Sequence, residues 1–319
     1  MSEHPGVDCM RRLAPAKLNL FLEVLARRAD GYHDIETLMV AVSVFDTVEF
    51  AARVDDELRV DCNVCPSCGT WARVGDSGDS ADRVPDGADN LAYRAAERLR
   101  QRAGIDRGAT IRITKRIPVA AGLGGASSDA AATLVAANRV WKIHWPIQQF
   151  LEVAGEIGSD VPFFITGGAA VCRGRGERVQ AIGRRGRLHF VIVRPPKGLR
   201  TADVYRCCEP AESARAVAPL AAAIRAGAPV EVARHMFNRL QFAAARLTHW
   251  IERLHDEFER LDCLGHQMSG SGTSYFGVCR HARHARRVAA RLRARAIGAV
   301  HVASTLAATV PVFVGARES

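Results

Sequence analysis

Apolar and polar residues alternate along much of the first fifty residues. From Lys17, apolar side chains recur at every second position, Leu18, Leu20 and Leu22, and a similar alternation runs over residues 35–50. A period of two is typical of a β-strand. The polar stretch at residues 27–33 lies between them and predicts a turn. The pattern therefore predicts two strands with a turn between them.

Helical periodicity and short apolar runs alternate through the rest of the chain. Apolar residues at helical spacing predict helices over residues 90–103, 122–140, 147–157, 213–226, 229–260 and 282–296. Strands are predicted over residues 110–117, 169–179, 189–193, 275–279 and 300–308. Residues 62–88 are crowded with Cys, Gly, Ser, Asp and Pro, lack periodicity and predict an inserted loop. Strands and helices in this mixture indicate an α+β fold class, mixed α/β.

A glycine-rich stretch at residues 118–129 follows one predicted strand and leads into a predicted helix. Glycines let the backbone pass close to a ligand, and the N–H groups at a helix N-terminus attract anions. Ser127 and Ser128 add hydroxyl groups for phosphate or Mg²⁺. A glycine loop with a serine cap would explain one glycine and one serine but not the whole stretch, so phosphate binding is predicted. No Gly-Lys dipeptide occurs, which excludes a Walker loop, and the Asp-Phe-Gly and His-Arg-Asp signatures of protein kinases are absent.

The charge balance of the 319 residues is basic, with a net charge of +10. Lysine occurs only at Lys17, Lys115, Lys142 and Lys197, so 40 of the 44 basic residues are arginine (44 − 4 = 40). A basic surface binds nucleic acid or steers anionic small substrates, and a preference for Arg codons is a third explanation. Because Lys is a compact point charge, each of the four is a candidate for a specific role.

Cysteine usage and the apolar runs indicate a cytoplasmic protein. Nine cysteines include the adjacent pair Cys207 and Cys208, which suits a reducing compartment better than a disulfide framework. The first ten residues contain no signal-peptide core, and no apolar run has membrane-spanning length, so no membrane partner is expected. Cys62, Cys65 and Cys68 have zinc-like spacing but lack a fourth ligand nearby, and a loop of free thiols is the preferred interpretation.

Residues 280–295 hold seven arginines and two histidines. Ala285, Val288 with Ala289, Leu292 and Ala296 form an apolar stripe at helical spacing, which places the arginines on a solvated face. No aromatic residue is interleaved to stack on bases, so no nucleic-acid partner is expected, and His281 and His284 require no metal.

The stretch Pro-Val-Ala-Ala-Gly-Leu-Gly-Gly-Ala-Ser-Ser-Asp-Ala-Ala at residues 118–131 resembles the ATP-binding motif of the GHMP kinases. Residues 14–22, Ala-Pro-Ala-Lys-Leu-Asn-Leu-Phe-Leu, and 28–33, Arg-Ala-Asp-Gly-Tyr-His, resemble one branch of that family, which acts on cytidyl diphosphate methylerythritol in the non-mevalonate isoprenoid pathway. Three further segments agree in order: residues 158–164, 238–241 and 268–273. The resemblance covers about residues 13–308.

The resemblance implies a two-domain kinase. Residues 1–185 would form an ATP-binding domain like ribosomal protein S5, and residues 186–319 a ferredoxin-like domain. It implies ATP and Mg²⁺ as cofactors, no metal held by the protein alone, and transfer of a phosphoryl group to the 2-hydroxyl of the small-molecule substrate cytidyl diphosphate methylerythritol. A GHMP kinase for another alcohol, of the mevalonate or sugar type, is the alternative, and a nucleic-acid-binding protein is the alternative of a different class.

The resemblance also implies site residues. Asp160 would be the catalytic base and Lys17 the ammonium beside it; without the resemblance they would be read as a helix cap and an edge-strand charge. Tyr32 and His33 would bind the cytosine, although a tyrosine in such a turn also packs on a core. Asn19 shares a strand face with Lys17 by period two. The implied ATP contacts are Asn90, Lys115, Pro118, Gly122, Leu123, Gly124, Gly125, Ser127 and Ser128, and the further substrate contacts are Gly270 and Gly272.

Overall fold

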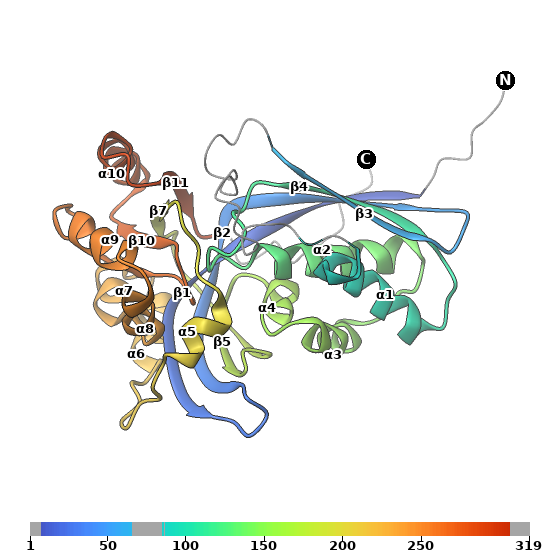
Figure 1. Cartoon of the computed structure of the whole chain (residues 1–319), viewed down its shortest axis with the longest axis horizontal. Helices are drawn as coiled ribbons and strands as arrows, with labels where there is room; N and C mark the ends of the chain where they lie inside the picture. The colour runs from blue at the N-terminus through green and yellow to red at the C-terminus, as the bar shows by residue number, and fades with distance from the viewer. Residues whose placement is uncertain (1–7, 66–84, 86, 307–319) are drawn as a thin grey trace.

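Two β-sheets, each with helices against it, organise the chain (Figure 1). The structure is a computed structural model and describes residues 8–65, 85 and 87–306. The larger sheet has the order β3-β4-β2-β1-β8, and β5 extends it by pairing with both β2 and β6. Its strands are β1 (Cys9–Arg27), β2 (His33–Ala52), β3 (Leu58–Val64), β4 (Ala109–Lys115), β5 (Ala169–Gly174), β6 (Arg178–Ile182) and β8 (Phe237–Asn238).

The long antiparallel pair of β1 and β2 carries the larger sheet, with Cys9 opposite Ala51 at one end and Arg27 opposite His33 at the other. All side chains of β1 from Ala14 to Val24 are buried, so the alternation of the sequence does not separate a core face from a solvent face. One set, which includes Leu18 and Leu20, packs in the core shared with the smaller sheet. The polar side chains of Lys17 and Asn19, between these apolar positions, are buried as well, which places polar groups inside the molecule.

Helices α1 to α4 lie together against one face of the larger sheet, as Figure 1 shows. They are α1 (Leu91–Ala103), α2 (Gly125–Val140), α3 (Ile147–Ile157) and α4 (Val161–Thr166), and a 3₁₀ turn, η3 (Gly87–Asp89), precedes α1. Helix α2 contacts β1, β2 and the other three helices. Because it is enclosed on nearly all sides, it needs small residues, which explains its run of alanines.

The smaller sheet has the order β11-β7-β10-β9, and all its neighbours are antiparallel. Its strands are β7 (His189–Arg194), β9 (Gly265–Met268), β10 (Tyr275–Cys279) and β11 (Ala299–Ser304). The helices of this half are α5 (Thr201–Arg206), α6 (Ala218–Ala226), α7 (Pro229–His235), α8 (Leu240–Leu247), α9 (Trp250–Glu259) and α10 (Ala282–Ala294). Strand, helices, two strands, helix and strand follow one another as in a ferredoxin-like unit. The predicted α+β fold class is confirmed.

Several elements differ from the sequence prediction. The expected strand over residues 169–179 is two strands, because Gly174 has a left-handed φ of 73° and turns the chain back. The expected helix over residues 229–260 is divided into α7, α8 and α9, with the short strand β8 between α7 and α8. Four elements carried no recognised signal: β3, α4, α5 and β9. Each is short or is stabilised by contacts with distant parts of the chain, which periodicity does not detect.

The predicted loop over residues 62–88 is wrong at its start, because residues 62–64 pair with β4 as the end of β3. Cys62 lies in that strand and Cys65 is buried, whereas Cys68 lies outside the described residues. The predicted strand over residues 300–308 is confirmed as far as Ser304, and residues 307 and 308 also lie outside them. In the part of the chain that the structure describes, every helix is too short or too polar to cross a bilayer.

Candidate active site

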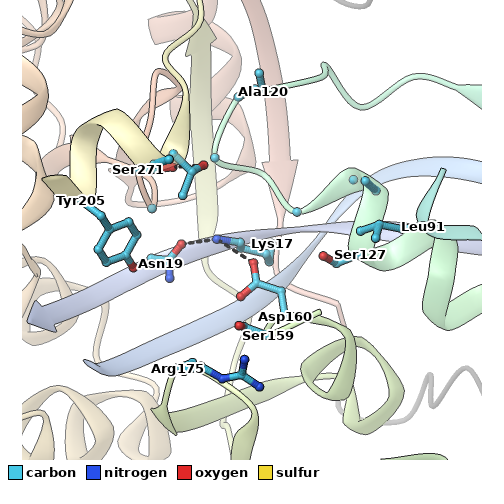
Figure 2. Close-up of a pocket in the computed structure, with 18 of the residues that line it drawn as sticks. Lys17, Asn19, Leu91, Ala120, Ser127, Ser159, Asp160, Arg175, Tyr205 and Ser271 are labelled. Carbon is cyan, nitrogen blue, oxygen red and sulfur yellow. Dashed lines mark hydrogen bonds and ion pairs between the residues drawn. The ribbon is translucent and has the colours of Figure 1, made fainter. Parts of the chain in front are cut away.

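A cavity of about 850 Å³ opens where β1, the start of α2 and the loop between β9 and β10 meet. Figure 2 shows its length: Ser127 and Leu91 lie toward one end, Tyr205 toward the other, and Lys17 and Asp160 lie between them. Segments that are distant in sequence supply these residues, from β1 to α5. The cavity is therefore elongated, with Lys17 and Asp160 in its middle.

Lys17 and Asp160 form an ion pair in the middle of the cavity, with 3.5 Å between Nζ of Lys17 and Oδ2 of Asp160 (Figure 2). The lysine side chain is 5% exposed and the aspartate 32%, so the ammonium is enclosed and the carboxylate faces the cavity. Asp160 directly precedes α4, but its side chain makes no capping hydrogen bond to that helix. Asp160 thus occupies the N-cap position of α4, as the alternative interpretation expected, but its carboxylate does not cap the helix and is directed to the cavity instead.

Asn19 holds the lysine in place. Its Oδ1 accepts a hydrogen bond of 2.5 Å from Nζ of Lys17, and its Nδ2 donates to Oγ1 of Thr37 at 2.8 Å. Thr37 in turn donates to the carbonyl of Phe21 at 2.6 Å. Lys17 and Asn19 of β1 and Thr37 of β2 thus form a connected network beneath the cavity. The prediction that Asn19 and Lys17 share one face is confirmed by this contact.

The glycine-rich loop is packed too tightly for side chains at two positions. Gly122 has a φ of 72°, and a Cβ there would lie 2.1 Å from the carbonyl oxygen of Ser269. Gly124 has the same φ, and its Cβ would lie 2.8 Å from the ring of Phe164 and 3.0 Å from Cγ of Lys17. Glycine is required at both, because L-residues avoid this backbone conformation and no space remains.

Gly124 is also the N-cap of α2, so the first turn of that helix opens onto the cavity. The first N–H groups of a helix lack partners within it and carry its positive end, which makes this turn an anion site. Ser127 lines the cavity at this turn, whereas Ser128 is buried below it. Phosphate contacts would come from the backbone and from Ser127 rather than from Ser128.

A buried ion cluster supports the same turn from below. Nζ of Lys115 donates to Oδ2 of Asp46 at 2.5 Å and to Oδ2 of Asp129 at 2.6 Å, and each of these side chains is at most 5% exposed. Burial would lower the pKa of Lys115, but the attraction of the two carboxylates is stronger and the pKa is raised. Burial raises the pKa of Asp129, and the negative charge of Asp46 acts in the same direction, whereas the charge of Lys115 opposes both. A Cβ on Gly125 would lie 3.2 Å from Nζ of Lys115, so the cluster braces the loop directly.

Aromatic and cationic side chains line the other end of the cavity. Tyr32 is 54% exposed, and the guanidinium carbon of Arg175 lies 5.0 Å from its ring centre. His33 is buried beside Tyr205, with 5.3 Å between the two ring centres. Burial, followed by the charge of Arg27, lowers the pKa of His33, so its imidazole is neutral at pH 7 and both donates and accepts hydrogen bonds. An exposed ring and a neutral imidazole suit a planar heterocycle.

The loop between β9 and β10 closes the cavity above Lys17. A Cβ on Gly270 would lie 3.0 Å from Oδ1 of Asn19 and 3.2 Å from Nζ of Lys17. Oγ of Ser271 lies 2.9 Å from Oγ1 of Thr201, which links this loop to α5. This glycine motif therefore contacts the lysine network itself.

The structure brings together most of the residues expected from the sequence. The cavity is lined by Lys17, Asn19, Tyr32, His33, Asn90, Lys115, Pro118, Gly122, Gly124, Gly125, Ser127, Asp160 and Gly270. Three expected contacts do not line it: Leu123, Ser128 and Gly272. Leu123 is 1% exposed in the core, and Gly272 packs against Met268. Asn90 lines the cavity, yet its amide already caps α1 by accepting from the N–H of Ala92 and donates to the carbonyl of Pro85.

Sequence reasoning missed other cavity residues, of which five offer polar or aromatic groups in new positions: Asp129, Ser159, Arg175, Thr201 and Tyr205. Asp129 lies within the recognised glycine motif, so its position was available as a signal. The other four lie in loops or in the short helix α5, where neither periodicity nor a glycine pattern marks them. Only the folding of these segments around β1 identifies them.

Comparison with known proteins gives matches along most of the chain. The model of the GHMP kinases N terminal domain matches residues 90–168, and that of the GHMP kinases C terminal region matches residues 220–298. A 4-diphosphocytidyl-2-C-methyl-D-erythritol kinase from Pelotomaculum thermopropionicum is 40% identical over 88% of this chain and 93% of its own length. The protein of that name from Bacillus subtilis is 34% identical over 88% of this chain and 91% of its own length.

Solved structures agree with these matches. A crystal structure of 4-(cytidine 5'-diphospho)-2C-methyl-D-erythritol kinase superposes with a TM-score of 0.73 at 33% identity, covering 92% of this chain and 98% of the other. A homoserine kinase from Cytophaga hutchinsonii has a TM-score of 0.72 at 20% identity, covering 96% and 97%, and shares the fold. The chain therefore belongs to the GHMP kinases, within the family of the 4-diphosphocytidyl-2-C-methyl-D-erythritol kinases.

Proposed function

We propose that this chain transfers the γ-phosphoryl group of ATP to the 2-hydroxyl of 4-diphosphocytidyl-2-C-methyl-D-erythritol, in the non-mevalonate route to isoprenoid precursors. The observation that carries the proposal is the Lys17–Asp160 pair between an anion-binding helix turn and an aromatic recess, all within one cavity. The family to which the chain belongs supports the same reaction.

The residues present fit a nucleoside triphosphate with its Mg²⁺. The first turn of α2 offers N–H groups to the phosphates, and the glycines keep side chains out of their path. Mg²⁺ bound together with ATP would neutralise part of the negative charge of the phosphates. The hydroxyl of Ser127 and the carboxylate of Asp160 are oxygen donors of the kind that it prefers, and both line the cavity.

Asp160 is the proposed general base. An alcohol is a weak nucleophile at neutral pH, and a positioned carboxylate accepts its proton as the new O–P bond forms. The carboxylate of Asp160 faces the cavity and accepts no capping hydrogen bond from the N–H groups of α4, which leaves its oxygen atoms available to accept the proton. Lys17 then has two tasks: it holds the carboxylate in position, and its charge stabilises the negative charge on the transferred phosphoryl group.

The cytidyl group is proposed to occupy the recess around Tyr32. The exposed ring of Tyr32 offers a stacking surface, and the neutral imidazole of His33 offers hydrogen bonds to a pyrimidine edge. Tyr205 adds a second aromatic wall, and Arg27, Arg175 and Arg206 line the cavity with charges suited to a diphosphate. In this arrangement the ATP and the acceptor meet at Asp160 from opposite ends.

A two-domain division at residue 185 and a cytoplasmic location belong to the same proposal. The consecutive strands of the larger sheet end with β6 at Ile182, and the smaller sheet begins with β7 at His189, which supports the division. None of the eight cysteines among the described residues forms a disulfide, in keeping with a reducing compartment.

ADP release from the purified enzyme tests the proposal. We expect ATP turnover with 4-diphosphocytidyl-2-C-methyl-D-erythritol and little with mevalonate, homoserine or methylerythritol phosphate, which lacks the cytidyl group. The product should carry its new phosphate on the 2-hydroxyl, as ³¹P and ¹³C NMR would establish. Equal turnover of mevalonate or homoserine would contradict the proposed substrate, and an absence of ADP release with every alcohol would contradict the proposed reaction.

A further inference from the structure

Three side chains with metal-binding atoms meet between α9 and β9, outside the cavity described above. His255 and Glu259 are one turn apart on α9, and His266 lies on β9. Their ligand atoms all lie within 4.8 Å of one another. Oε1 of Glu259 is 3.2 Å from Nε2 of His266 and 3.8 Å from Nε2 of His255. The two imidazoles thus direct the same ring nitrogen toward one carboxylate.

A single phenol organises both imidazoles from behind. The hydroxyl of Tyr275 is 3.2 Å from Nδ1 of His255 and 3.1 Å from Nδ1 of His266. Tyr275 is fully buried at the start of β10, so its hydroxyl is a fixed point. Metal-binding histidines use one ring nitrogen as ligand while a second group holds the other, which sets the orientation of the ring. This arrangement provides that second group for both histidines at once.

A second cluster of similar residues shows what distinguishes the first. His284 lies 3.0 Å from Asp262, but Arg287 contacts the same carboxylate at 2.6 Å and Arg280 approaches it at 3.6 Å. Two guanidinium groups beside that carboxylate repel a cation. Glu259, in contrast, has the two imidazoles as its ion-pair partners, and an imidazole nitrogen can serve as a metal ligand.

We propose that His255, Glu259 and His266 form a binding site for one divalent transition-metal ion such as Zn²⁺. Two imidazole nitrogens and one carboxylate oxygen are a ligand set that zinc accepts, with water in the fourth position. Glu259 is 62% exposed and His255 48%, whereas His266 is 10% exposed, so the site is anchored in the fold and open on its outer side. Mg²⁺ prefers oxygen ligands and should not compete.

The position of the site gives the metal a structural consequence. His266 and Tyr275 lie on the paired strands β9 and β10, and the loop that joins these strands contacts Lys17 and Gly122. A metal ion would fasten α9, at the outer edge of the molecule in Figure 1, to the base of this hairpin. Because the ion would bind the folded chain and not the unfolded one, it should raise thermal stability.

Titration of the metal-stripped full-length protein with ZnCl₂ at pH 7.5 tests the proposal. We expect one equivalent of zinc to bind by calorimetry and the Tm to rise, with no such effect of MgCl₂. His255→Gln and Glu259→Gln each remove one exposed ligand. Neither variant should bind the equivalent of zinc or show the rise in Tm. Tyr275→Phe keeps all three ligands but removes the group that orients them, and its zinc affinity should fall by about 10–100-fold.

His235→Gln is the matched control. His235 and Glu231 form the same one-turn pair on α7, also 3.8 Å apart, but no second imidazole joins them in the described metal-ligand groups. Replacing His235 should therefore leave zinc binding unchanged. Binding of Co²⁺ adds a test of ligand type, because cysteine thiolates give an intense near-ultraviolet charge-transfer band and nitrogen and oxygen ligands do not. Absence of zinc binding, or zinc binding that survives in both His255→Gln and Glu259→Gln, would overturn the proposal. A Co²⁺ spectrum with a thiolate band that these variants leave unchanged would overturn it too, by placing the metal on cysteines.

Discussion

Asp160 derives its proposed role from where its carboxylate faces. The residue stands at the beginning of a six-residue helix without capping it, and its nearest charged partner is the enclosed ammonium of Lys17 at 3.5 Å. The ammonium of Lys17 holds this carboxylate from the inner side, and the opposite side of the carboxylate is accessible to a substrate in the cavity. The pair is therefore expected to act as one unit.

Replacing Asp160 by Asn should lower kcat by about 10²–10⁴-fold, because the amide keeps the shape but accepts no proton. Lys17→Ala and Lys17→Arg should also fail, since the enclosed site is built for a point charge and not for a planar fork. The double variant Asp160→Asn with Lys17→Ala should be little worse than the more damaged single variant. Steady-state kinetics give these values, and Asp256→Asn on the exposed face of α9 is the control. A near-normal kcat in folded Asp160→Asn would place the base elsewhere.

Tyr32 should determine affinity for the acceptor and not for ATP. Its ring is exposed in the recess, and stacking on a base contributes about 1–3 kcal/mol. Tyr32→Ala should therefore raise KM for the cytidyl substrate by about 5–150-fold, whereas Tyr32→Phe keeps the ring and should remain close to the parent. KM for ATP, measured in the same assays, should hardly change. An acceptor KM unaffected by Tyr32→Ala would exclude the recess as the cytidine site.

The buried carboxyl of Asp129 should make stability depend on pH. Burial raises the pKa of Asp129 to about 7, above the value of about 3.9 in an unfolded chain. A raised pKa contributes stability that is complete below about pH 4 and is lost as the pH rises toward 7. Asp129→Asn does not ionise and has no such loss.

The difference in free energy of unfolding, Asp129→Asn minus parent, should therefore increase from pH 5 to pH 8. We expect an increase of at least about 1 kcal/mol, since one unit of pKa corresponds to about 1.4 kcal/mol. Urea unfolding at several pH values measures this difference. The exposed variant Asp256→Asn should show no comparable trend. A difference that stays constant or turns against Asp129→Asn as the pH rises would mean that Asp129 is ionised throughout.

The glycine-rich loop and helix α2 act together, because the turn that exposes the helix N-terminus is only possible with glycine. Gly122 combines a left-handed φ with a neighbouring carbonyl that occupies the place of a Cβ. The loop is thereby pressed between β1, α4 and the β9–β10 loop, and its N–H groups are held in position before any ligand binds. Rigid placement of this kind favours catalysis by positioned charges.

Gly122→Ala should therefore lower both stability and ATP affinity. The backbone conformation alone costs about 1–2 kcal/mol, and the contact with the Ser269 carbonyl, 2.1 Å from the added Cβ, forces the β9–β10 loop to shift. Gly183→Ala is the matched control, because a Cβ there meets nothing within 4 Å and its φ is not left-handed. Thermal unfolding and ATP titration of both variants check this. A Gly122→Ala protein with parental Tm and ATP affinity would show that the loop readily rearranges.

Asn238 is one of the side chains that link the two sheets, and it does so beside the cavity. Strand β8, which contains Asn238, pairs with β1 of the larger sheet. The amide Nδ2 of Asn238 donates to the carbonyls of Met268 and Gly270, both at 2.8 Å, at the end of β9. One buried side chain thus connects the strand that carries Lys17 to the loop that covers it.

Asn238→Ala should destabilise the protein by about 1–3 kcal/mol, because it leaves buried carbonyls without a donor. Asn238→Asp should be worse, since a carboxylate beside two carbonyl oxygens repels them. Urea unfolding measures the stability, and kcat should fall in parallel because Gly270 no longer has a fixed position. Gln180→Ala on the exposed face of β6 provides the comparison. An Asn238→Ala variant with full stability and activity would mean that the other contacts between the sheets, such as the hydrogen bonds from Gln267 to the carbonyls of Asn19 and Leu20, suffice to hold them together.

The sequence by itself determined the fold class, the long helices and the chemistry of the glycine-rich stretch. Helices such as α1 and α10 have a complete apolar stripe, and the glycine motif needs its local order of residues to form a turn, so both kinds of information lie within about twenty consecutive residues. The resemblance to the GHMP kinases rested on the same local motifs. These features are local because hydrogen bonding and helix periodicity are local.

Only the tertiary structure decided which of the motif residues face the cavity. Ser128 and Leu123 lie within the recognised stretch, yet both are buried, Ser128 in α2 and Leu123 in the core shared with the smaller sheet, while Asp129 from the same stretch reaches the cavity wall. Tyr205 and Arg175 come from segments without a motif and reach the recess through pairing of β5 and packing of α5. The burial of both faces of β1 follows from contacts with residues more than a hundred positions away. Local sequence specifies which turn or helix forms, but long-range packing decides which of its side chains meet a ligand, because that packing is set by the whole chain at once.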